Sequence, residues 1–265
     1  MTFSPALPFS GYGGWTVLKR TSAVQVATQD AQPQVKRDVD YFRANIAKVK
    51  TADALVADRR LLRVALGAFG LEGDLNNKAF IRKVLAEGTL KDGAFANRLA
   101  DKQYEKLSAA FGFGDFNTPR NVISGFADKL ISQFSQRSFE KAVGEQNSSF
   151  RLAMNIEREL PALAKRTGSD DLLWLTMLGS GPMRSVFQTA FGLPQSFASI
   201  DLDKQLETLK DKAASMFGSS SLRQFTDPQK LDGLIRQFLV RSDLDTGSAR
   251  SAGASALVLL QNIRR

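Results

Sequence analysis

From Val39 onward, the apolar residues of this chain recur with the period of an α-helix. The first apolar face, with spacings of one, four and three residues, consists of Tyr41, Phe42, Ile46 and Val49. No Asn-Gly hairpin turn and no alternating run of β-branched residues interrupts the pattern. The sequence therefore predicts an all-α fold, built as one elongated helical bundle or as two related helical lobes.

Caps and glycines divide this pattern into separate helices. Thr51 is typical of an N-cap, and Gly70 and Gly88 are typical of residues that end a helix. Thr118 and Asp227 each precede a proline, which favours a helix start. The helices predicted after the first cover residues 51–69, 77–86, 95–111, 118–143, 149–166, 170–178, 182–191, 201–217, 227–241 and 248–263.

The first 36 residues differ from the rest of the chain. They include three prolines and the glycine-rich run Gly11–Gly14, and no helical or strand period persists through them. This composition predicts a flexible N-terminal arm, in which Trp15 is a candidate for docking on a partner or on the body of the protein. The predicted parts are the arm (1–36), helical lobe 1 (37–140), helical lobe 2 (141–246) and an apolar C-terminal helix (247–265).

Two stretches of the chain share the pattern V-x-x-x-A-F-G-L. They are Val64–Leu71 and Val186–Leu193. The pattern predicts a helix that places a phenylalanine in the core and ends at a glycine in the left-handed conformation. The residues assigned to these structural positions are Phe69, Gly70, Phe191 and Gly192. Two explanations of the match remain open: an old duplication, or the chance recurrence of a common helix ending.

The chain of 265 residues contains no cysteine and no histidine. It therefore lacks disulfides, thiol nucleophiles, cysteine-type zinc sites and the commonest general base. The glycine run Gly11–Gly14 matches no phosphate-binding motif, and no nucleophile, base and oxyanion donor come together in the sequence. We therefore predict a protein that is not an enzyme and has no catalytic residue, no cofactor and no metal.

The net charge of +9 is concentrated near the two ends of the chain. Residues 1–60 carry nine basic and five acidic side chains, and residues 247–265 carry three basic side chains and none that is acidic. The nearly neutral body argues against a nucleic-acid partner, which a basic folded face would attract. No apolar run is long enough to span a membrane, and no cleavable signal peptide is visible.

The end of the sequence carries an apolar stripe that suits helix packing. It consists of Ala252, Ala256, Leu257, Val258, Leu259, Leu260 and Ile263. A helix of this kind buries itself against its own bundle or against another subunit. Leu257, Leu260 and Ile263 are therefore candidate interaction residues, and self-association is one way to bury them.

Four blocks of the sequence resemble a known family. The blocks are Asp53–Leu71, Asn77–Leu85, Phe95–Asp101 and Arg184–Pro194, within a resemblance that spans roughly residues 37–245. The chain is similar here to an alphaproteobacterial family that shares a domain of unknown function and whose genes commonly lie in flagellar gene clusters. The resemblance implies flagellar components as protein partners and supplies no catalytic residues.

These observations predict a structural or assembly protein of the bacterial flagellum that acts through helix-mediated protein–protein contacts. One alternative is a cytoplasmic flagellar assembly factor, and another is an all-α nucleic-acid-binding regulator. We expect the chain to be made in the cytoplasm, and the sequence leaves open whether it is exported to the flagellum.

Overall fold

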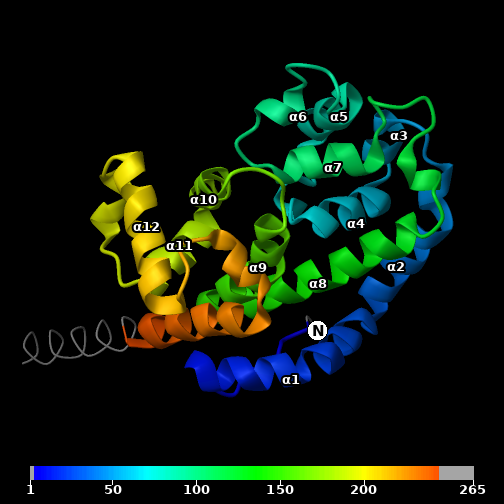
Figure 1. The fold of residues 1–265 in the computed structure, drawn as a ribbon. Helices are drawn as coiled ribbons and strands as arrows, with labels where there is room; N and C mark the ends of the chain where they lie inside the picture. Colours follow the sequence, from blue (N-terminus) through cyan, green and yellow to red (C-terminus); the bar gives the residue numbers. More distant parts are fainter. Residues whose placement is uncertain (1–2, 245–265) are drawn as a thin grey trace, which may run out of the picture. The chain divides into compact units, whose positions relative to one another are not determined.

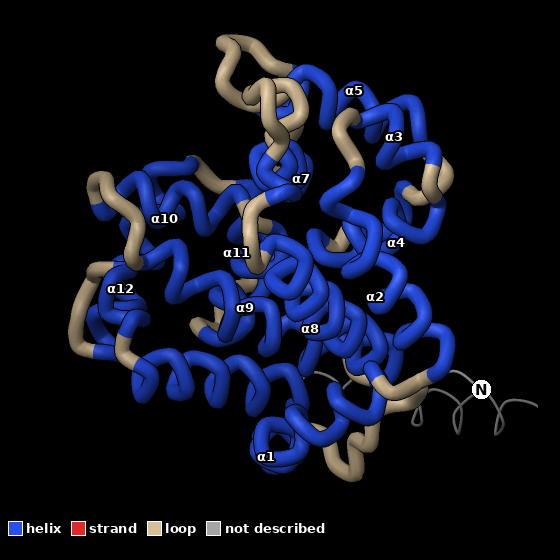
Figure 2. Tube along the Cα trace, turned by 90° about the vertical axis from the view of Figure 1, so that its right-hand side faces the viewer, coloured by secondary structure: helices blue, strands red, loops and turns tan. Residues whose placement is uncertain are grey.

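The computed structural model describes residues 3–244. Every regular element among these residues is a helix, which confirms the predicted all-α fold (Figures 1 and 2). The chain divides into two compact units. The described residues of unit 1 are 3–5 and 21–142, and those of unit 2 are 6–20 and 143–244. The change of unit after residue 142 lies close to the predicted lobe boundary after residue 140.

Unit 1 contains the second part of α1 and most of α8, with shorter helices between them. Its elements are α1 (Gly11–Asp30), α2 (Pro33–Asn45), η1 (Ile46–Lys48), α3 (Ala52–Ala57), α4 (Arg59–Phe69), η2 (Glu72–Asp74), α5 (Lys78–Glu87), α6 (Phe95–Arg98), α7 (Gln103–Phe111), η3 (Arg120–Val122) and α8 (Phe126–Gln146). Helix α4 packs against α2, α3 and α7. Eight of its eleven residues are buried, so α4 is the centre of this unit's core.

Three predicted helices of unit 1 have different boundaries in the structure. The helix predicted over 51–69 is broken at Asp58, whose carboxylate accepts hydrogen bonds from the backbone N–H groups of Arg60 and Leu61 and so starts α4. The helix predicted over 95–111 is broken at Leu99, which is extended, and it resumes as α7.

The long helix predicted from residue 118 begins only at Phe126. The side chain of Asn121 donates hydrogen bonds to the backbone oxygens of Ile46 and Val49, at 2.6 and 2.7 Å. These bonds hold the preceding segment against η1, and Gly125 has a φ of 80°. The chain therefore turns before α8 can start.

Asp38 on α2 is a buried carboxylate, with 4% of its side chain exposed. It accepts hydrogen bonds from Arg63 at 2.8 Å, from Gln34 at 3.1 Å and from Arg60 at 3.2 Å. Burial alone raises the pKa of a carboxyl, but these three donors outweigh it and hold the pKa of Asp38 below its usual value. The cluster links α2 to α4 through charged groups.

We expect Asp38→Asn to lower the free energy of unfolding by about 2 kcal/mol at neutral pH, because it removes charge-assisted hydrogen bonds at a buried position. The folded-state pKa lies below the unfolded value of about 4, so the carboxylate stabilises the fold above that pH. Its contribution is lost as the pH falls through the folded-state pKa. Urea unfolding at a series of pH values measures this. Asp40→Asn, at an exposed position of α2, is the control, and a constant deficit at all pH values would contradict the assignment.

Unit 2 contains the first part of α1, the end of α8 and the helices that follow. Its further elements are α9 (Ser148–Ala164), α10 (Asp170–Gly179), α11 (Gly181–Ala190), η4 (Gln195–Ser199), α12 (Leu202–Phe217), η5 (Leu222–Thr226) and a last helix over residues 228–244, shown in orange in Figure 1. Aromatic rings dominate its core. Phe187 on α11 makes edge contacts with Trp174, Phe191 and Phe225 at centroid distances of 5.4–5.5 Å.

The prediction of a flexible arm over residues 1–36 is wrong for residues 11–30, which form α1. Trp15 and Leu18 are 1% and 2% exposed, and the Trp15 ring packs against Phe150 of α9. The buried positions of this part of α1 are Gly11, Gly14, Trp15 and Leu18, which have helical spacing. Two of the four are glycines, which have no apolar side chain to mark a buried helix face in the sequence.

Trp15→Ala should destabilise unit 2 by about 3–5 kcal/mol, because a buried indole leaves a large cavity. Val24→Ala, at a position of α1 that is 70% exposed, should change stability by less than about 0.5 kcal/mol. Thermal unfolding followed by circular dichroism measures both effects. Limited proteolysis of the wild-type chain should leave α1 intact. A first cut within α1, with an unchanged unfolding temperature, would restore the flexible-arm interpretation.

The two units share part of their order of elements. In each, two helices are joined by one extended residue: Asp58 (φ −89°, ψ 102°) joins α3 to α4, and Ser180 (φ −91°, ψ 107°) joins α10 to α11. A 3₁₀ turn follows in both units. In unit 2 the next helix, α12, ends in Phe-Gly at Gly218, whereas in unit 1 α5 and α6 come before the Phe-Gly helix α7, which ends at Gly112. A second 3₁₀ turn and a long helix complete each repeat.

The V-x-x-x-A-F-G-L stretches end α4 and α11 in the same way. Phe69 is 7% exposed and Phe191 is 2% exposed. Gly70 and Gly192 have φ values of 74° and 65°. In each case the glycine N–H donates a hydrogen bond to the backbone oxygen three residues earlier. The N–H of the following leucine donates to the backbone oxygen five residues earlier, and together these bonds form the Schellman motif. All four residues thus lie where the sequence pattern places them.

Phe69→Ala should lower the free energy of unfolding by about 3–5 kcal/mol, because the ring leaves a cavity. Gly70→Val should also destabilise, since a β-branched residue is strained at positive φ. A side chain at Gly70 would also press on Arg137, whose Nη1 lies 2.9 Å from the position of the added Cβ. Leu90→Ala, at a position 69% exposed, is the control. Normal unfolding temperatures with loss of motility would instead identify Phe69 as a partner-binding residue.

Candidate functional site

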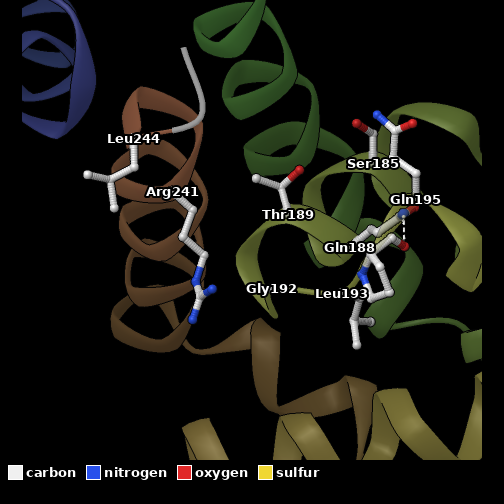
Figure 3. A pocket seen from close by; sticks show the side chains of 9 residues that line it. Ser185, Gln188, Thr189, Gly192, Leu193, Gln195, Arg241 and Leu244 are labelled. Atoms are coloured by element: carbon white, nitrogen blue, oxygen red, sulfur yellow. Dashed lines mark hydrogen bonds between the residues drawn. The ribbon is translucent and has the colours of Figure 1, made fainter. Parts of the chain in front are cut away.

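A groove of about 540 Å³ lies in unit 2, where the end of α11 meets the last described helix. Figure 3 shows its side chains. The lining residues are Ser185, Gln188, Thr189, Gly192, Leu193, Pro194, Gln195, Arg241 and Leu244. They combine hydroxyls and amides with a short apolar strip and one guanidinium, which is a lining suited to recognising another molecule.

The end of α11 forms one wall of the groove. Its Schellman motif turns the chain at Gly192 and directs Leu193 and Pro194 back along the helix. The side-chain amide of Gln188 donates a hydrogen bond of 2.7 Å to the backbone oxygen of Pro194, which holds this turn against α11. The end of α11 therefore has two roles: Phe191 is buried in the core, and the residues that follow it line the groove.

The helix over residues 228–244 forms the opposite wall. Asp227 caps its start by accepting a hydrogen bond from the backbone N–H of Gln229, as its Asp-Pro sequence predicted. Tyr12 of α1 donates a 2.6 Å hydrogen bond to Asp232, and Ser149 of α9 shares a 2.6 Å hydrogen bond with Ser242. These contacts hold two sides of the helix and leave Arg241 and Leu244 at the groove.

Arg241 is the one ionised side chain among the groove residues. Its guanidinium lies over Gly192, where a Cβ would overlap Nη1, and so it faces the negative end of the α11 dipole. Within the described part of the chain it has no ion-pair or hydrogen-bond partner. The lining therefore carries one positive side chain and several hydrogen-bonding groups, and none of its side chains is an acid or a base suited to proton transfer.

None of the candidate interaction residues is among the described residues that line this groove. Trp15 is buried and packs on Phe150, so of its two predicted docking surfaces, a partner or the body of the protein, the structure shows the body. Leu257, Leu260 and Ile263 lie outside the described residues. Gly192 was assigned a structural position, and it has that position and also lines the groove.

Arg241 and Leu244 were missed by the sequence analysis, although a second internal repeat points to Arg241. Residues 130–138 and 234–242 share the pattern L-I-x-Q-F-x-x-R-S, six identities in nine positions. In both units the arginine of this pattern lies over the glycine that ends an A-F-G-L helix: Arg137 over Gly70, and Arg241 over Gly192. A comparison of the two long helices with each other would have found the contact.

Other kinds of site find little support in the described part of the chain. No group of three or more acidic side chains there is arranged to hold a metal ion. Among the described helices, none combines the length and the apolar character that crossing a membrane requires.

The sequence matches the DUF1217 family, described as proteins of unknown function, over residues 68–231. The chain belongs to this family. The chain is also similar to the crystal structure of a protein from Agrobacterium tumefaciens, with a TM-score of 0.71 and 28% sequence identity. That similarity covers 91% of this chain and 99% of the other. No curated protein matches the chain.

Proposed function

We propose that this DUF1217 protein is a non-enzymatic structural or assembly component of the bacterial flagellum that acts through helix-mediated contacts with other proteins. The main support is the exposed apolar edge of the last described helix. Val240 and Leu244 are 43% and 66% exposed and lie four residues apart, so they share one face. Apolar side chains paired in this way on a helix surface suit packing against a partner.

A second apolar stretch of the sequence lies nearby. The stripe that includes Leu257, Leu260 and Ile263 begins eight residues after Leu244, beyond the mostly polar residues 245–251. An exposed apolar pair and an apolar stripe so near in the sequence favour protein contacts through the end of the chain. A second copy of this chain and another flagellar protein are both partners of the required kind.

The flagellar assignment comes from the family resemblance, through the location of the genes. Within that assignment, a cytoplasmic assembly factor is the alternative to an exported structural component. An all-α nucleic-acid-binding regulator is weaker, because residues 61–246 carry 24 basic and 22 acidic side chains. Binding to nucleic acid should then be weak and should disappear near physiological salt.

Basal bodies with attached hooks should contain this chain if it is a structural component. Leu257→Ser/Leu260→Ser/Ile263→Ser should reduce its amount there about tenfold or more, since each change removes an apolar contact. Quantitative mass spectrometry of purified basal bodies and of the cytoplasm, from strains that carry each version, measures both. Absence from basal bodies with a motility defect in a deletion strain favours the assembly factor. Normal motility and assembly after deletion would contradict a flagellar role.

The control for this experiment is Leu90→Ser, in unit 1. Leu90 is 69% exposed, so the change leaves the core untouched and removes a similar apolar side chain from a surface far along the sequence from residue 257. The control protein should co-purify like the wild type, and both variants should keep the wild-type unfolding temperature.

A further inference from the structure

The two equivalent arginines of the repeats differ in their partners. Arg137 donates a hydrogen bond of 3.3 Å to the side-chain oxygen of Gln103, which lies nine residues before the Phe-Gly glycine of α7, Gly112. In unit 2 the residue nine positions before Gly218 is Leu209, which is 1% exposed. A leucine side chain has no hydrogen-bond acceptor, so this position offers no oxygen to Arg241.

The space beside the glycine also differs between the repeats. In unit 1, Glu72 follows two residues after Gly70 and pairs with Lys141 of α8 at 3.2 Å. The residue two positions after Gly192 is Pro194, which has no charge to pair. Unit 1 therefore pairs polar side chains of its own near this glycine, whereas unit 2 has a groove beside Gly192.

We propose that the groove of unit 2 binds an acidic, amphipathic segment of a protein partner. A carboxylate of the partner pairs with Arg241, and apolar side chains of the partner pack on Leu193, Pro194 and Leu244. Charge complementarity supports this occupant, because among the described residues the groove lining has one guanidinium, which no side chain there pairs with, and no carboxylate. The hydrogen bond between Arg137 and Gln103 shows within the same chain that a side-chain oxygen delivered from a helix fits this arginine position. The inference rests on the proposed role in protein–protein contacts.

The form of the groove favours a peptide segment over other ligands. Its polar lining side chains are exposed or half-buried, so they would not enclose a small molecule as a cofactor pocket does. A nucleic-acid backbone requires several cations in a row, and Arg241 is the single cation of this lining. An exposed protein segment needs one charged anchor with apolar surface around it, which the groove provides.

Photo-crosslinking in cells tests the proposal with the full-length chain. The crosslinker p-benzoylphenylalanine replaces Gln195, an exposed groove residue, and the crosslinked peptide is identified by mass spectrometry. We expect one partner, crosslinked through a segment that contains Asp or Glu. Arg241→Glu should lower the crosslink yield about tenfold or more, and Arg241→Lys should lower it less, because it keeps the charge. A Glu→Lys or Asp→Lys change in the partner segment should restore the yield with Arg241→Glu.

Matched controls separate binding from folding. Arg184→Glu reverses an exposed charge on α11 outside the groove and should leave the yield unchanged. Leu244→Ser changes an exposed groove residue without touching the core and should lower the yield severalfold. A crosslinker at Ala214, exposed on α12, should not capture the same segment.

The proposal is overturned by any of four results: no crosslink from residue 195, a crosslinked segment without an acidic residue, a yield insensitive to Arg241→Glu, or a crosslink to residues 245–265 or another part of this chain. The proposed function is judged separately. A crosslinked acidic partner that is not a flagellar protein would support peptide binding in the groove and contradict the flagellar role. Finding the chain in basal bodies without a groove crosslink would support the flagellar role and contradict peptide binding in the groove.

Discussion

Each unit of this protein depends on one helix end, at which a phenylalanine enters the core and the next residue reverses the chain. The two features occur together in both units: Phe69 and Phe191 are buried, and the glycine that follows each has a positive φ. Glycine makes that turn without steric cost, and its missing side chain leaves room for an arginine from the long helix. The guanidinium then faces the carbonyl end of the helix, where a positive charge is favourable. One short pattern thereby connects the core, the turn and the following helix of each unit.

The sequence predicted the elements whose signals are local. The helical period identified most of the helices, and Thr51, Gly70 and Asp227 mark boundaries that the structure also has. The burial of Phe69 and Phe191 followed from the same local pattern. Helix breaks at Leu99 and before Phe126 were not predictable in this way. They depend on contacts such as the one from Asn121 to the carbonyl oxygens of residues 46 and 49, which join segments more than 70 positions apart in the chain.

The errors at α1 and at the groove have one physical origin. Glycine was interpreted only through its backbone freedom, yet in α1 its small size is what matters. Gly14 lets the Phe150 ring approach the backbone, since a Cβ there would lie 2.9 Å from that ring. At the groove, Gly192 was recognised as a helix end, but its contact with Arg241 is 49 positions away and leaves no local signal. Close packing against glycine has to be inferred from repeats or observed in the structure.

The similarity between the two units allows the surroundings of Arg241 in unit 2 to be compared with those of Arg137 in unit 1. If both units had kept the same side chains, an exposed arginine next to a helix end would be an ordinary surface feature, worth little energetically. Instead, the shared framework persists at Phe-Gly, at L-I-x-Q-F-x-x-R-S and at the single-residue joints Asp58 and Ser180, while the side chains around the arginine differ. Leu209 and Pro194 stand where unit 1 has Gln103, the partner of Arg137, and Glu72, the partner of Lys141, while the arginine is present in both units. The guanidinium in unit 2 keeps its contact with Gly192 and the α11 dipole, and these alone account for its role in the fold. Its remaining hydrogen-bonding capacity and the apolar side chains beside it are available for a partner.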